Sequence, residues 1–316
     1  MRLGRRLRIR RRRLRLLLDM KPRIAITAGD PAGIGPEIAW KAASHPDVLA
    51  VCEPVIYGPH TSADLAPFAR GRVSGPSGRA AYEAIVGAVN DAREGRVHGI
   101  ATAPINKEAF AAAGLPWKGH TDLLAHLTGA PRGVMMFYAD ALRVVLATVH
   151  IPLADVPRAI TRELIEATVL LTARELPRFG HAEPKLAVAG LNPHAGENGL
   201  LGREDQDVLR PAIDACVAAG IAVSGPFPAD TIFVRAMRGE FDAVIACYHD
   251  QGLIPVKMAA FGKAVNVTLG LPIIRTSVDH GTAFDIAGRG TADSGSMIEA
   301  VKLAARLAQR AGTRPT

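Results

Sequence analysis

Three apolar runs of the sequence each end in a histidine, namely His150, His194 and His249. Such runs are typical of buried strands, and the carboxyl ends of parallel strands meet at one edge of a sheet, where open α/β folds build ligand sites. Three neutral imidazoles with an open position can hold a catalytic divalent ion. The residue types therefore predict a metal site at this edge.

The spacing of these histidines leaves an alternative open. Their gaps of 44 and 55 residues match no short metal motif, so three separate histidines at strand ends are the other interpretation. Polar, turn-forming residues around two of them, at 192–197 and 249–252, favour a shared site.

A second group of polar residues stands in apolar or glycine-flanked stretches. A lysine and an arginine with histidine, threonine and asparagine suit a dianionic phosphate or a carboxylate, whereas each alone is also common as a solvated or capping side chain. The candidates are His120, Thr121, Lys257, Asn266 and Arg275.

A glycine-rich turn at 29–37 lies between an expected strand and an expected helix, whose N-terminus could face an anion or nucleotide. The turn is neither the dinucleotide fingerprint nor a phosphate-binding Walker loop, so a tight structural turn is equally compatible. The cluster 277–283 is expected to begin a helix, where an aspartate either caps the helix or contacts a cofactor. The candidate cofactor residues are Gly29, Asp30, Gly33 and Asp279.

The elements that must position these residues alternate between apolar β-branched runs and alanine-rich helical stretches. This alternation predicts an α/β fold with a mostly parallel sheet covered on both faces. The expected strands are 24–27, 51–57, 97–101, 134–138, 142–149, 185–190, 241–247 and 264–268. The expected helices are 36–43, 80–92, 205–219, 296–309 and one after the cap Thr161 to about 176.

Length and cysteine content bound the class of protein. The 316 residues can form two lobes of about 150 residues each. The three cysteines are odd in number and scattered among apolar neighbours, which predicts buried free thiols in a reducing compartment, the cytoplasm.

The net charge of +8 comes from a basic leader, residues 1–19. Nine of the 38 basic residues and one of the 30 acidic residues lie there, which leaves 29 of each in the rest of the chain. The body is therefore not expected to bind nucleic acid, and no apolar stretch suits a secretory signal or a membrane span. We expect an over-extended start with Met20 as the first residue. The alternative is a basic arm for RNA or anionic lipid, or an organelle-targeting segment.

Six motifs in order resemble the 4-hydroxythreonine-4-phosphate dehydrogenase family of vitamin B6 biosynthesis. They are residues 27–37, 119–121, 191–197, 228–231, 248–252 and 266–282. The resemblance implies a fold of the isocitrate and isopropylmalate dehydrogenase type, with two α/β/α lobes flanking a cleft. It implies a homodimer whose subunits share each active site. The expected lobes are a cofactor-side lobe of 20–106 plus 248–316, and a metal, substrate and dimerisation lobe of 107–247.

The resemblance also implies an activity. NAD, or NADP, would oxidise 4-phosphooxy-L-threonine at C3 to 2-amino-3-oxo-4-phosphooxybutanoate, which decarboxylates to 3-amino-2-oxopropyl phosphate. Relatives with the same motifs oxidise 4-phospho-threonate, erythronate or aromatic cis-dihydrodiols, so these substrates stay open. The implied ligands of one zinc, magnesium or cobalt ion are His150, His194 and His249. The implied substrate contacts are His120, Thr121, Lys257, Asn266 and Arg275, and proton transfer falls to Lys257 or Asp250.

Overall fold

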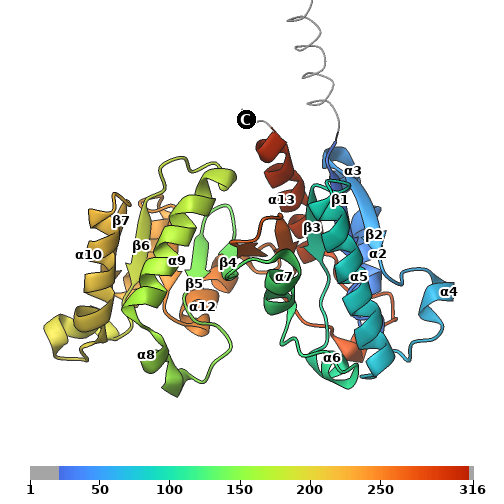
Figure 1. The fold of residues 1–316 in the computed structure, drawn as a ribbon, viewed down its shortest axis with the longest axis horizontal. Coiled ribbons are helices and arrows are strands. Elements are labelled where there is room, and N and C mark those ends of the chain that lie inside the picture. The colour runs from blue at the N-terminus through green and yellow to red at the C-terminus, as the bar shows by residue number, and fades with distance from the viewer. Residues whose placement is uncertain (1–20, 313–316) are drawn as a thin grey trace, which may run out of the picture. The chain divides into compact units, whose positions relative to one another are not determined.

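The computed structural model describes residues 21–312, which form two compact units (Figure 1). Unit 1 runs to Trp117 and resumes at Ile273, and unit 2 is Lys118–Pro272. The expected leader, 1–19, lies outside the described residues. The expected lobe boundaries at 106 and 247 differ from these: the helix Lys107–Ala112 packs on the helix Gly75–Arg93 of unit 1, and the helix that begins at His249 packs on strands of unit 2.

Unit 1 contains four strands that are all parallel. They are β1 (Arg23–Thr27), β2 (Glu53–Tyr57), β3 (Gly99–Thr102) and β10 (Arg275–Ser277), in the order β2-β1-β3-β10. Every residue of β3 is buried, and because successive side chains of a strand alternate, both faces of the sheet are covered. The helices are α2 (Gly35–Ala43), α3 (Pro46–Val51), α4 (Ser62–Leu65), α5 (Gly75–Arg93), α6 (Lys107–Ala112) and α13 (Gly295–Gly312).

Unit 2 contains six strands in the order β9-β4-β5-β8-β6-β7, of which only β4 is antiparallel to its neighbours. The strands are β4 (Val134–Tyr138), β5 (Arg143–Leu146), β6 (Leu186–Ala189), β7 (Val223–Phe227), β8 (Ala243–Ala246) and β9 (Val265–Leu269). The helices are α7 (His120–Thr128), α8 (Val156–Ala159), α9 (Arg162–Glu175), α10 (Arg210–Ala218), α11 (Ala229–Met237) and α12 (His249–Ala260).

One apolar core of unit 2 lies between β5, β8 and β6 and the helices α11 and α12. Phe137, Leu146, Ile232, Phe233 and Val256 belong to this core and are buried. The core fixes both helices on the strands that carry the histidine-bearing segments.

The predicted α/β class with a mostly parallel sheet is confirmed. Local capping explains where elements begin. Thr161 caps α9 as predicted, because its side chain accepts a hydrogen bond from Leu164 N. The helix expected from residue 80 begins at Gly75, because Ser74 supplies the cap and proline is tolerated in the first turn.

Two expectations about local structure are wrong. The strand expected from residue 51 begins at Glu53, because His45 caps the short helix α3 just before it. The cluster 277–283 begins no helix: after β10 the chain is irregular up to a short 3-10 turn, Phe284–Ile286. The predicted buried free thiols are confirmed for Cys52, Cys216 and Cys247.

Candidate functional site

The three histidine-bearing segments leave neighbouring strands of unit 2. β5, β8 and β6 lie side by side, and both pairs are parallel. His150 comes four residues after β5, His194 five residues after β6, and His249 opens α12 three residues after β8. The prediction that these segments share one edge of a parallel sheet is confirmed.

Two of the three imidazoles are close together. The ring centroids of His150 and His249 are 5.5 Å apart. Nδ1 of His249 lies 2.7 Å from Oδ1 of Asp250, which leaves Nε2 as the ring nitrogen able to bind a metal. A carboxylate that orients a histidine in this way is typical of metal ligands. Among residues 21–312, no three or more His, Cys, Asp or Glu side chains are grouped so that they could hold a metal ion.

His194 begins a left-handed turn. Five consecutive residues, 194–198, have positive φ, and four of them are not glycine, with φ of 53° at His194 and 43° at Glu197. This conformation costs an L-residue about 1–2 kcal/mol, so the surrounding structure must impose it. Strain of this kind is commonest at functional sites.

Asp205 holds the segment that leads into this turn. Its carboxylate is buried, with Oδ1 accepting a hydrogen bond from Leu191 N at 2.8 Å and Oδ2 accepting one from Asn192 N at 3.0 Å. The side-chain amide of Asn192 also donates to Asp205, at 3.0 Å. These bonds position the backbone just before His194. No local sequence pattern marks Asp205, because its carboxylate binds backbone amides 13 and 14 residues away in the chain.

Two anion candidates of unit 2, Thr121 and Asn266, lie at β9. A methyl group added to Gly133 would meet Cγ2 of Thr121 and Cγ2 of Thr268, each at 3.0 Å, so the first turn of α7 packs on the start of β4 and the end of β9. Asn266 is on the same face of β9 as Thr268, two residues earlier. Its buried Oδ1 has no hydrogen-bond partner among the described residues.

Lys257 lies on α12, eight residues after His249, a rise of about 12 Å along the helix. Its side chain is exposed. Ile254 and Met258 lie on the exposed side of the same helix and Phe261 directly follows its end, with Met258 83% and Phe261 82% exposed. Lys257 is therefore displayed among apolar side chains, two turns away from His249 of its own chain.

Arg275 lies in unit 1, at the start of β10. It is only 2% exposed, and its guanidinium donates a hydrogen bond to Thr102 Oγ1 at 2.7 Å. Burial lowers the pKa of Arg275 to about 9, so the group is still a cation at neutral pH.

The glycine-rich turn of unit 1 is tightly packed. Gly29 has φ of 68°, and a side chain there would collide with the carbonyl of Pro104. Asp30 is fully buried, and its Oδ1 accepts a hydrogen bond from Ala32 N at 2.8 Å. Burial raises the pKa of Asp30. Gly29 and Asp30 therefore hold the turn together, as expected if the glycine-rich segment is a tight structural turn.

Gly33 and Asp279 occupy different settings in unit 1. Gly33 lines an open groove of about 250 Å³, which Glu37 and Arg70 also line. Asp279 accepts a hydrogen bond from the Ser296 hydroxyl at 2.9 Å, at the first turn of α13. It therefore supports α13 and does not cap a helix that begins at 277–283.

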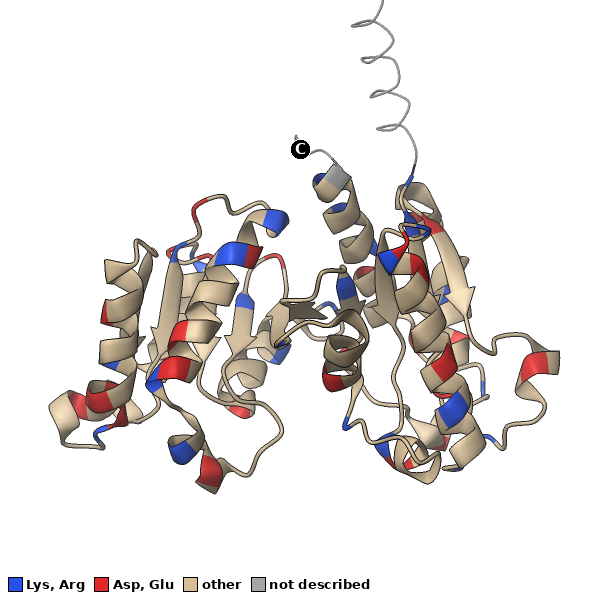
Figure 2. Cartoon of the chain, viewed as in Figure 1, with Lys and Arg blue, Asp and Glu red and all other residues tan. Residues whose placement is uncertain are grey.

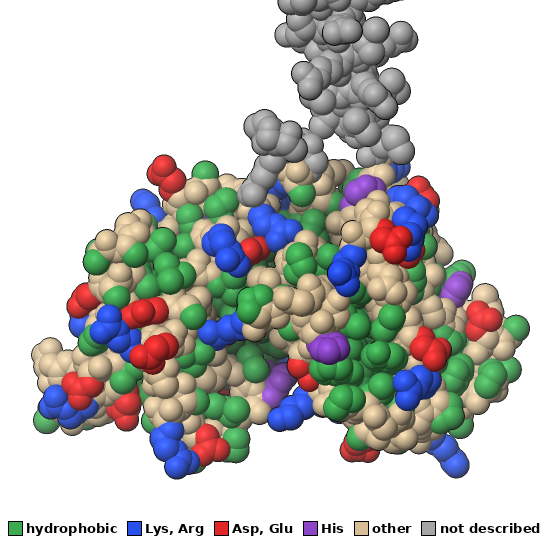
Figure 3. Space-filling view, viewed as in Figure 1, with side chains coloured by type: hydrophobic (Ala, Val, Ile, Leu, Met, Phe, Trp, Pro, Cys, Tyr) green, Lys and Arg blue, Asp and Glu red, His purple; other side chains and the backbone are tan. Residues whose placement is uncertain are grey.

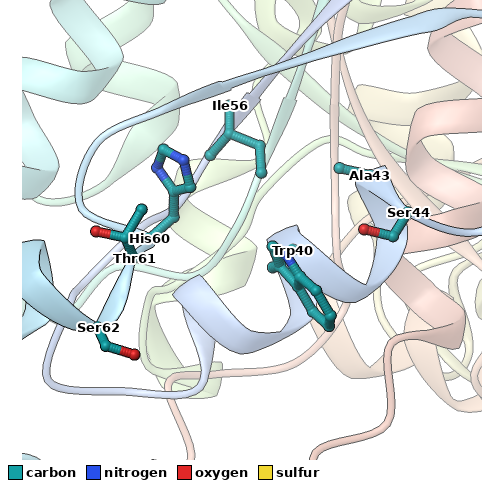
Figure 4. A pocket seen from close by; sticks show the side chains of 7 residues that line it. All are labelled: Trp40, Ala43, Ser44, Ile56, His60, Thr61 and Ser62. Carbon is teal, nitrogen blue, oxygen red and sulfur yellow. The ribbon is translucent and has the colours of Figure 1, made fainter.

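A second groove of unit 1, of about 630 Å³, shares Trp40 and His60 with the first. Trp40 is 58% exposed, and Figure 4 shows its indole on α2, with His60 on the loop that follows β2. Thr61 and Ser62 add hydroxyls to the lining. The sequence does not predict this groove, because a single tryptophan on a helix is more often a core residue.

The charged side chains mix both signs. Figure 2 shows lysines, arginines and acids interspersed in both units, and Figure 3 shows no broad single-sign patch on the face in view. Within residues 21–312, no helix combines the length and the apolar character that a membrane span needs.

Comparison with known proteins gives a consistent result. The family described as "Pyridoxal phosphate biosynthetic protein PdxA" matches residues 22–304. The chain is 45% identical to the 4-hydroxythreonine-4-phosphate dehydrogenase of Desulforapulum autotrophicum, covering 94% of this chain and 98% of that protein. It is 43% identical to the D-threonate 4-phosphate dehydrogenase of Cupriavidus necator, over 92% and 99%.

Solved structures agree with these sequence matches. The 4-hydroxythreonine-4-phosphate dehydrogenase of Klebsiella pneumoniae superposes with a TM-score of 0.83 at 40% identity, covering 92% of this chain and 99% of that one. A terephthalate 1,2-cis-dihydrodiol dehydrogenase of Burkholderia xenovorans gives 0.64 at 30% identity, over 90% and 98%. The chain therefore belongs to the PdxA family of pyridoxal phosphate biosynthesis, and it is an oxidoreductase that acts on a CH–OH group.

Proposed function

We propose that the chain oxidises 4-phosphooxy-L-threonine at C3 with NAD or NADP and a divalent ion. A nicotinamide bound to the chain would supply the two-electron oxidation by accepting hydride from C3, and a basic side chain would take the hydroxyl proton. The product, 2-amino-3-oxo-4-phosphooxybutanoate, is a β-keto acid and loses carbon dioxide to give 3-amino-2-oxopropyl phosphate. The observation that carries the proposal is the set of three histidines at the ends of the adjacent parallel strands β5, β8 and β6.

His150, His194 and His249 are the proposed ligands of one zinc, magnesium or cobalt ion. Their residue types suit such an ion, and the rings of His150 and His249 are 5.5 Å apart, with Asp250 orienting that of His249. When bound, the ion lowers the pKa of a coordinated hydroxyl and stabilises negative charge on its oxygen. Asp250 is committed to His249, so we assign proton transfer to Lys257.

The phosphate is assigned to His120, Thr121, Lys257, Asn266 and Arg275. The guanidinium of Arg275 suits this role, because a buried cation gains more from a dianion than an exposed one does. The buried amide oxygen of Asn266 suits a donor group of the substrate.

The nucleotide of the cofactor is assigned to unit 1. The groove beside Gly33 continues past Trp40, whose exposed indole suits stacking with an adenine ring. In this proposal Gly29, Asp30 and Asp279 support the cofactor site indirectly. Gly29 and Asp30 hold the glycine-rich turn, and Asp279 holds the first turn of α13.

We also propose a homodimer in which each active site takes residues from both subunits. The exposed apolar side chains Ile254, Met258 and Phe261 suit a protein interface. Lys257 lies among them, about 12 Å along α12 from His249 of its own chain, and we assign it to the active site of the partner subunit.

A second substrate, D-threonate 4-phosphate, is favoured by the relative of that name at 43% identity. The decisive experiment measures NADH or NADPH formation by the purified protein with Zn²⁺, Mg²⁺ or Co²⁺. The panel contains 4-phosphooxy-L-threonine, D-threonate 4-phosphate, erythronate 4-phosphate and an aromatic cis-dihydrodiol. We expect the highest kcat/KM for 4-phosphooxy-L-threonine, with release of carbon dioxide and loss of activity on chelation. Preference for another member of the panel would overturn the substrate assignment, and full activity after complete chelation would overturn the metal.

A further inference from the structure

Buried hydrogen bonds join the ends of the three histidine-bearing strands. Gln251 lies in the first turn of α12 and is buried. Its Oε1 accepts a hydrogen bond from Cys247 N at 2.6 Å, just after β8. Its Nε2 donates to the carbonyl of Gly190 at 2.7 Å, just after β6. One side chain therefore ties the segment before His249 to the segment before His194.

The third strand is tied to the same point. Thr148 is buried just after β5, and its hydroxyl donates a hydrogen bond to the carbonyl of Cys247 at 2.7 Å. The backbone N–H of Thr148 points to the same carbonyl at 3.1 Å. The carbonyl of Cys247 thus accepts hydrogen bonds from Thr148, which follows β5, and its N–H donates one to Gln251. We call Thr148, Cys247, Gln251 and Gly190 the strand-end network.

The chemistry of Gln251 is specific to this position. A glutamate would keep the acceptor for Cys247 N but could not donate to the Gly190 carbonyl, and a methionine could do neither. Inside a protein, a polar atom left without its partner costs about 1–3 kcal/mol, so the three strand ends resist sliding past one another. Slippage of one strand end would change the spacing of the imidazoles.

We propose that Gln251 and Thr148 are positioning residues, which hold the segments of His150, His194 and His249 at the spacing that a divalent ion requires. Neither side chain is assigned a contact with the ion or the substrate. The inference rests on the proposed metal site, and it adds to that site the element of the structure that sets its geometry.

The test titrates the full-length protein with Co²⁺ and records metal affinity and the visible absorption spectrum of the bound ion. The variants are Gln251→Glu, Gln251→Met and Thr148→Val. Thr172→Val is the matched control, since it removes a buried hydrogen bond of 2.7 Å to Thr168 within α9. Thermal unfolding of each variant is measured in parallel, so that lost stability is separated from lost positioning.

We expect Co²⁺ to bind about 10- to 100-fold more weakly to the Gln251 and Thr148 variants, with an altered spectrum. The control should lose comparable stability and keep the affinity and spectrum of the wild type. Wild-type affinity and spectrum in a folded Thr148→Val and in either folded Gln251 variant would overturn this inference alone. If His249→Ala binds Co²⁺ as tightly as the wild type does, the proposed metal site is overturned, and this inference with it.

Discussion

Arg275 is the residue on which the phosphate assignment can be tested most directly. Because its buried guanidinium would pair with a dianion, Arg275→Met should raise KM for the phosphorylated substrate by about 100-fold, at roughly 1.5–3 kcal/mol for each lost charge-assisted hydrogen bond. Steady-state kinetics measure this change. Arg143→Met is the control, since Arg143 donates to the backbone carbonyls of Asp242 and Asp140 in unit 2. An unchanged KM in Arg275→Met would contradict the assignment.

Asp30 is a buried carboxyl group whose charged form is disfavoured by its burial. Its pKa is raised above the ordinary value of 3.8, so the folded chain holds the proton more tightly than the unfolded chain. Stability from this group is present below pH 3.8 and is lost as pH rises through the raised pKa. Asp30→Asn keeps the acceptor for Ala32 N and removes the charge.

We therefore expect Asp30→Asn to unfold at a higher temperature than the wild type at pH 7, with the difference vanishing below pH 3.8. Thermal unfolding monitored by circular dichroism across this pH range measures the effect. A variant destabilised at pH 7 would show that Asp30 is stabilised by an interaction of its charge, and a gain that persists in acid would show that the gain does not come from the charge. A large rise in KM for NAD would assign it to the cofactor directly.

The left-handed turn at 194–198 depends on a carboxylate from the segment that follows it. Asp205→Asn replaces one acceptor oxygen by an amide that faces N–H donors, so we expect a loss of roughly 1–3 kcal/mol in unfolding free energy. The amides of Leu191 and Asn192 should also exchange their hydrogens faster. Asp207→Asn is the neighbouring control, because Asp207 is exposed and its side chain pairs with Arg203. Equal exchange in the two variants would mean that Asp205 does not hold the turn.

Sharing of active sites between two subunits makes a quantitative prediction. His150→Ala and Lys257→Met should each be inactive alone. If the two residues of one site come from different subunits, mixed dimers contain one intact site, and an equal mixture recovers about a quarter of wild-type activity. The variants are mixed under conditions that exchange subunits, and activity is assayed. Sites confined to one subunit would give no recovery.

The apolar stripe on α12 is the surface that this dimer should bury. Met258→Asp would place a charge on a side chain that is 83% exposed in the single chain. We expect a monomer by analytical ultracentrifugation with little loss of secondary structure, because Met258 makes no part of the core. A dimer of unchanged affinity would place the interface elsewhere.

The histidine-bearing segments show which features a local sequence pattern can predict. The apolar runs before His150, His194 and His249 are local patterns, so they predicted the strands, and the alternation with helices predicted the α/β class. The motif at 248–252 contains Gln251, but a glutamine in a turn motif carries no sign of its partner. That partner, the Gly190 carbonyl, lies 61 residues away in the chain.

The sequence pattern does not determine the order of the strands in the sheet or which residues of different strands contact one another. β5, β8 and β6 became neighbours only through the packing of the helices between them, and strand order depends on long-range crossovers that no local periodicity encodes. The hydrogen bond from Leu191 N to Asp205 and the distance of two helical turns between His249 and Lys257 both depend on the path of the backbone in space. The sequence gives only the number of residues between the members of each pair, and helices and turns decide in which direction each side chain points. Residue type thus determined which chemical groups the chain offers, and tertiary packing determined which of these groups lie close together.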